Sequence, residues 1–168
     1  MLQGELSQLG GMTPGPPEPS LEHIRHILTR DIEAVGKEVQ ATPDADLWRT
    51  LPGIHNSVGT IAVHLCGNLR HFIGQEIGGD GYQRQREAEF SGTPWPREEL
   101  MAEIERTRNA VDEVLAYLDP ERLGEPMSNP PPHHAGRSIG FFLMQLSCHL
   151  SRHTGQANYL RRMLAAQA

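Results

Sequence analysis

The chain has 168 residues, of which 38% are hydrophobic, and its formal net charge is −6 at pH 7. This length suits one domain with a sizeable core, since a domain of about 150 residues buries roughly 70% of the surface that its unfolded chain exposes. The acidic balance argues against a nucleic-acid-binding protein, which would carry a basic stripe, and no apolar run approaches the ~20 residues of a membrane span.

The N-terminal segment differs in composition from the rest. Residues 1–19 are mostly Gly, Pro and polar residues, so we expect a flexible tail followed by one domain over 20–168. Met12 could be the true start. The segment lacks the basic start and apolar core of a signal peptide, and the two cysteines provide no disulfide framework. Both features predict a cytoplasmic protein.

Apolar residues at spacings of three and four predict four amphipathic helices. The first begins at the N-cap Ser20 and ends before Pro43. The second is capped by Ser57 and stops at the glycine pair 78–79.

The third helix begins at Pro96 and ends at Asp119, before Pro120. The fourth begins near Ser138 and runs to about Ala165. Residues 79–95 are too long for a tight turn, so the third helix can run parallel to the second. With no strand alternation, and with long connections after helices two and three, the pattern predicts an all-α bundle.

Two histidines interrupt the apolar stripe of the fourth helix. His149 and His153 lie one turn apart where the stripe would otherwise be aliphatic, and two imidazoles so placed could bind one metal ion. This spacing alone is a weak signal, and buried, hydrogen-bonded histidines are the alternative. His64 supplies a third inward imidazole from the second helix. A three-histidine site suits zinc, nickel, copper or iron(II).

Three segments together resemble a known family. They are His64-Leu65-x-Gly67-Asn68-Leu69, Arg84-x-Arg86-Glu87-Ala88-Glu89-Phe90 and His149-x-x-x-His153-x-Gly155-Gln156. In order and spacing, over about residues 20–165, they resemble the DinB-like (YfiT-like) superfamily of metalloproteins. The resemblance implies a four-helix bundle of up-down-down-up type, often dimeric. It also implies a divalent metal, zinc or nickel, held by His64, His149 and His153. It assigns no catalytic role to the loop from Arg86 to Phe90.

Family members with an assigned role are thiol S-transferases, thiol-dependent isomerases or metal-dependent hydrolases. The resemblance therefore implies an enzyme that acts on small electrophilic molecules with a low-molecular-weight thiol. A hydrolase with a metal-activated water, a non-catalytic metal-binding or stress-response bundle, and a purely structural bundle remain alternatives. The expected partners are a small-molecule substrate and a second copy of the chain, with neither nucleic acid nor membrane.

Further polar residues are candidates for supporting roles. Asn68 and Gln156 could orient ligands, with helix–helix hydrogen bonding as an equal alternative. Cys66 is expected to be a small buried side chain, and neither cysteine is expected to be a ligand. Among the other histidines, we expect His71 to be partly exposed, and His55 could lie near the mouth of the site. We interpret the adjacent pair His133 and His134 as ordinary loop residues. Glu76 and Glu89 are possible general bases without support.

Overall fold

The computed structural model describes residues 21–167, so the tail expected over 1–19 and the cap expected at Ser20 lie outside the described residues. The regular elements of this range are all helical, and the only β structure in residues 21–167 is two isolated bridges. The predicted all-α class is therefore confirmed.

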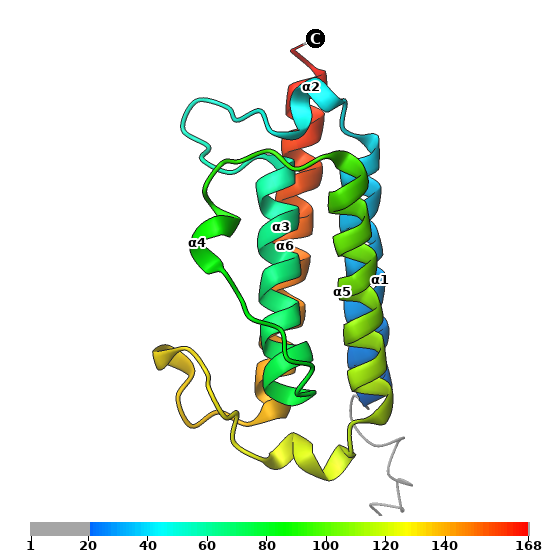
Figure 1. Ribbon diagram of the computed structural model, residues 1–168, viewed down its shortest axis with the longest axis vertical. Helices are drawn as coiled ribbons and strands as arrows, with labels where there is room; N and C mark the ends of the chain where they lie inside the picture. The colour runs from blue at the N-terminus through cyan, green and yellow to red at the C-terminus, as the bar shows by residue number, and fades with distance from the viewer. Residues whose placement is uncertain (1–20, 168) are drawn as a thin grey trace, which may run out of the picture.

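Four long helical segments lie side by side (Figure 1). They are α1 (Leu21–Ala41), α3 (Val58–Leu69) with its π-helical continuation η1 (Arg70–Ile77), α5 (Arg97–Tyr117) and α6 (Ile139–Ala165). In Figure 1, α1 and α6 run upward, whereas α3 and α5 run downward. Helix α1 packs against α5 and α6, and α3 packs against the same two helices.

Local signals in the sequence set the helix ends. The Ser57 hydroxyl accepts a hydrogen bond from the Thr60 backbone N–H at 3.0 Å, which caps α3. The Ser138 hydroxyl accepts from the Phe141 N–H and caps α6 in the same way. Pro96 immediately precedes α5, where its missing N–H costs nothing. These three predicted helix starts are confirmed.

Helix α3 is the most buried of the long helices: each of its twelve residues is buried. Helix α6 instead buries one stripe, namely Ile139, Phe142, Leu143, Leu146, Leu150, Ala157, Leu160 and Leu164. A polar side chain on α3 therefore has no route to bulk solvent except through a cavity. His64 and Asn68 are the polar side chains near its middle, each 8% exposed.

Two long connections cover one side of α3. The first holds the single turn α4 (Arg86–Glu89), and the second holds the 3-10 turns η2 (Pro120–Gly124) and η3 (Pro132–His134). In Figure 1, α4 and the η3 loop both project to the left, one above the other. The remaining element, α2 (Asp44–Leu47), follows α1 at the opposite end from η2.

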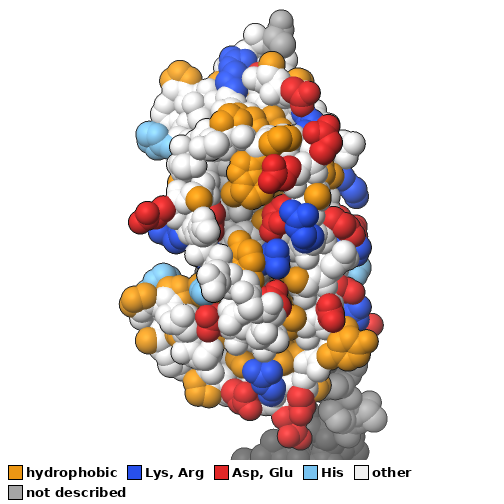
Figure 2. Space-filling view, in the orientation of Figure 1, with side chains coloured by type: hydrophobic (Ala, Val, Ile, Leu, Met, Phe, Trp, Pro, Cys, Tyr) orange, Lys and Arg blue, Asp and Glu red, His pale blue; other side chains and the backbone are white. Residues whose placement is uncertain are grey.

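The outer surface has a mixed character. On the face in Figure 2, acidic, basic and hydrophobic side chains are interspersed, and no broad patch of one sign is visible on this face. No helix among residues 21–167 is both long enough and apolar enough to cross a membrane.

Candidate metal centre

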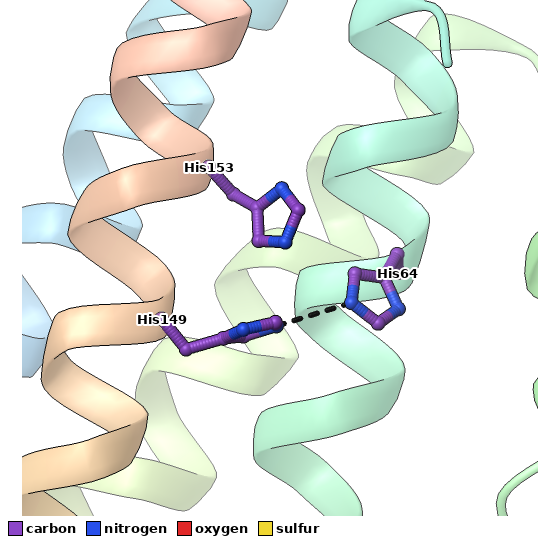
Figure 3. A group of neighbouring side chains, drawn as sticks. All are labelled: His64, His149 and His153. Atoms are coloured by element: carbon purple, nitrogen blue, oxygen red, sulfur yellow. Dashed lines mark hydrogen bonds between the residues drawn. The ribbon is translucent and has the colours of Figure 1, made fainter. Parts of the chain in front are cut away.

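Three histidine side chains converge between α3 and α6. His64 comes from α3, and His149 and His153 come from successive turns of α6 (Figure 3). One ring nitrogen of each residue lies within 4.8 Å of those of the other two. The sequence pattern therefore identified side chains that the fold does bring together. The group could hold a metal ion, because imidazole nitrogens are common ligands of zinc, nickel and copper.

The closest contact in this group joins two nitrogens. His64 Nε2 and His149 Nε2 are 3.1 Å apart. Two lone pairs at this distance repel, so either a proton or a cation must lie between them. For comparison, two nitrogens bound to one tetrahedral zinc at about 2.0–2.1 Å are about 3.3 Å apart. The donor set and its spacing therefore fit a divalent ion.

A carboxylate fixes the orientation of the His64 ring. Glu89 Oε2 lies 2.9 Å from His64 Nδ1, and Arg84 donates to both carboxylate oxygens at 2.6 and 2.8 Å. Burial alone would raise the pKa of Glu89, but the hydrogen bonds from Arg84 and His64 outweigh it, and the pKa is lowered. An ionised Glu89 can only accept, so His64 carries its proton on Nδ1. The Nε2 lone pair of His64 then points at the other histidines.

Gly67 makes room for this carboxylate. It lies on α3 one turn beyond His64, and a Cβ built there would be 2.9 Å from Glu89 Cδ and closer still to Oε1. Any larger residue would push Glu89 away from His64. The glycine is thus part of the support for the histidine, although it has no side chain of its own.

Burial keeps the two α6 imidazoles neutral. Desolvation, with the neighbouring His153 and His64, lowers the pKa of His149 to about 4. Desolvation and His64 also lower the pKa of His153, with Gln156 acting in the opposite direction. A neutral imidazole has the free lone pair that metal ligation requires, so both residues are in the competent state at neutral pH.

A cavity of about 800 Å³ opens beside the three histidines. Its walls include the rings of Phe72, Phe90 and Phe142, and Phe90 stacks against His64 with ring centroids 5.0 Å apart. The buried Oδ1 of Asn68, on the same wall, has no hydrogen-bond partner in the described part of the chain. The site therefore combines aromatic walls with a polar atom that lacks a hydrogen-bond partner, which is typical of a small-molecule site.

The family model described as the DinB superfamily matches residues 28–157, which include all three histidines. The chain belongs to the DinB superfamily. A comparison with curated proteins gives no match. The family match confirms the resemblance identified in the sequence.

In this DinB-superfamily chain, the structure places the other candidate residues as follows. Asn68 lines the cavity of about 800 Å³ beside the three histidines, which we call the metal cavity. Gln156 is exposed and lines a second cavity of about 690 Å³, and Asn56 lines both. His55 lies in this second cavity. The buried Nδ1 of His153 makes no hydrogen bond of normal geometry, to Gln156 or to any other described residue.

Three further histidines add polar groups to the wall of the metal cavity. His71 is partly exposed, as expected, but it also lines the cavity, and its Nε2 lies 4.0 Å from Glu76. His133 and His134 were interpreted as ordinary loop residues, but both line the metal cavity. The reason is that η3 folds back beside α6, where the His134 ring meets Phe142 at 5.8 Å. No local sequence pattern indicates this packing.

The two cysteines are not ligands of this group. Cys66 is buried, and desolvation raises the pKa of its thiol to about 12, so it stays protonated. Cys148 is exposed. The acidic candidates are also accounted for: Glu89 supports His64, and Glu76 accepts hydrogen bonds from Ser128 and Asn129. The sequence analysis did not predict that Arg84 binds Glu89 or that Gly67 makes room for it. A glycine within an apolar helix was a signal for the second role, and none was available for the first.

Proposed function

We propose that this DinB-superfamily protein is a divalent-metal-dependent S-transferase, which joins a low-molecular-weight thiol to a small electrophile. The observation that supports it is the convergence of three imidazoles on the wall of an open cavity of about 800 Å³. A three-ligand site with an open position is typical of catalytic rather than structural zinc. We propose His64, His149 and His153 as the ligands, with zinc or nickel as the metal.

The reaction joins the sulfur of the thiol to the electrophilic carbon, while the leaving group departs with the bonding electrons. The products are a thioether and the leaving group as its anion, and the thiol proton is released to solvent. A bound divalent ion would supply the lowered thiol pKa that makes the sulfur a thiolate at neutral pH.

The residues of the chain contribute positioning. Glu89 fixes the tautomer of His64, and Arg84 keeps that carboxylate ionised by donating to both oxygens. The rings of Phe90 and Phe142 give the space beside the histidines apolar walls. The unpaired Oδ1 of Asn68 is available to orient a donor group of either reactant.

Metal content and thiol consumption test the proposal. Protein purified without a histidine tag should contain about one zinc or nickel per chain, and His149→Ala should lose most of it, whereas loss of the exposed His26 should change nothing. With glutathione or cysteine and 1-chloro-2,4-dinitrobenzene, the metal-loaded protein should accelerate thioether formation. Equal rates for the wild type and His149→Ala would refute the transferase, and absence of metal would refute the metal site.

We also propose that the four long helices form a bundle of the up-down-down-up type, which the helix directions in Figure 1 support. We propose a homodimer as well. Phe141, Met144 and Tyr159 are 39%, 55% and 65% exposed on one side of α6, where a second copy would cover them. A monomeric mass by light scattering would refute the dimer. Two free cysteines support a reducing compartment such as the cytoplasm.

A further inference from the structure

The charged side chains that line the metal cavity are all of one sign. Arg84 and Arg86 belong to the lining, and neither Asp nor Glu is among the described residues that form it. Glu76 and Glu89 contact residues of the lining but are not part of it, and both are engaged by hydrogen bonds from the protein. The interior therefore differs from the outer face in Figure 2, where acidic and basic side chains are mixed.

The two arginines are not equivalent. Arg84 is used within the protein, because its guanidinium group donates to both oxygens of Glu89 and neutralises that charge. Arg86 is exposed at the edge of the cavity and has no carboxylate partner among residues 21–167. Its guanidinium carbon lies 5.8 Å from the Phe90 ring centroid, and the Phe90 ring lies 5.0 Å from that of His64. Arg86 therefore contacts Phe90, and Phe90 in turn contacts His64 of the three-histidine group.

The charges around the site do not balance. Three histidine ligands bring no negative charge to a divalent ion, and Glu89 is already offset by Arg84. Arg86 adds one more positive charge to the same cavity. Clefts lined by charges of one sign favour ligands of the opposite sign, and the effect is moderate here because solvent screens the exposed Arg86.

We propose that the cavity takes ligands that carry a carboxylate, and that the guanidinium group of Arg86 binds this carboxylate while the reactive end of the ligand lies at the three histidines. The position of the reactive end rests on the proposed function, but the carboxylate site does not. Arginine suits this role because its planar fork can donate two parallel hydrogen bonds to one carboxylate.

A sulfur-blocked probe tests the carboxylate site separately from the transferase. The probe is 4-(methylthio)butanoate, compared with its neutral amide, 4-(methylthio)butanamide. Its sulfur cannot become a thiolate, so binding requires no turnover. Dissociation constants are measured by NMR chemical-shift titration of the full chain, both metal-free and zinc-loaded. The wild type should bind the acid about tenfold more tightly than the amide, and Arg86→Gln should remove this preference.

Two further variants complete the test. Arg86→Lys should recover part of the preference, because it keeps the charge and loses the fork. Arg162→Gln removes the same charge from an exposed arginine that lies outside both cavities, and should bind as the wild type does. Equal binding of acid and amide by the wild type, or an acid preference that survives Arg86→Gln, would overturn the proposal. A failed transferase assay together with Arg86-dependent acid binding would refute the transferase alone.

Discussion

Gly67→Ala tests the support of His64 with the smallest change that the chain allows. The substitution removes no polar group and adds one methyl group inside a buried helix. The new Cβ would lie 2.9 Å from Glu89 Cδ, whereas non-bonded carbon atoms prefer about 3.5–4.0 Å. The carboxyl group must therefore retreat by about 0.6 Å or more, which lengthens and weakens its 2.9 Å contact with His64 Nδ1.

Two opposing terms determine the effect on stability. Replacing glycine by alanine within a helix stabilises it by about 0.5–1 kcal/mol when the site has room. Disturbing the hydrogen bonds of a buried, ionised carboxylate costs about 1.5–3 kcal/mol. We expect a net loss of about 1 kcal/mol or more. With His64 as a ligand, as proposed above, the loss of its hydrogen bond to Glu89 should also weaken zinc binding by about 10- to 100-fold.

Gly36→Ala provides the matched control. Gly36 is also a buried helical glycine, but a Cβ there would meet Ile104 Cγ2 at 3.6 Å and Met101 Cε at 3.7 Å, which are ordinary contacts. It should stabilise the protein and leave zinc affinity unchanged. Urea denaturation gives the free energy of unfolding, and competition with a chromogenic chelator gives zinc affinity. If Gly67→Ala behaves as Gly36→Ala in both assays, Glu89 does not support His64 and the reasoning is wrong.

Three other predictions concern the same region. Glu89→Gln leaves the partly buried Arg84 without its anion, so it should lower the free energy of unfolding by about 2–4 kcal/mol and weaken zinc binding. A double-mutant cycle with Arg84→Gln should show coupling, and additive effects would contradict it. In the metal-free protein, the folded-state pKa of His149 is about 4, below its ordinary value, so the unfolded chain binds more protons between that pH and about 6.5. Stability should therefore fall by about 1–2 kcal/mol as the pH is lowered through this range, since solvent screens part of the shift at this half-buried ring, and His149→Gln should flatten the dependence measured by urea denaturation. In the native protein, Ellman's reagent at pH 8 should react with Cys148 and spare Cys66, whose thiol pKa is about 12; rapid reaction of both thiols, or reaction that persists in Cys148→Ser, would contradict the burial.

Much of the helical framework was predictable because its signals are local. Ser57 and Ser138 cap the helices that they precede, and the apolar stripe of α6 is buried as its spacing predicts. The three histidines were predictable for the same reason, since helical periodicity determines which face a side chain occupies. The π-helical turn at Arg70–Ile77 was not predicted, because its sequence keeps the apolar spacing of an ordinary helix.

By itself, the sequence determined the positions of the long helices, the inward face of each, and the three imidazoles that those faces carry. Only the tertiary structure decided that Glu89 and Arg84 stand behind His64, that Gly67 admits them, and that Arg86, His133 and His134 share a cavity with the histidines. These residues lie in loops or depend on loops. Periodicity reports the orientation of side chains along a regular helix, whereas the course of a loop depends on packing against residues far away in the chain.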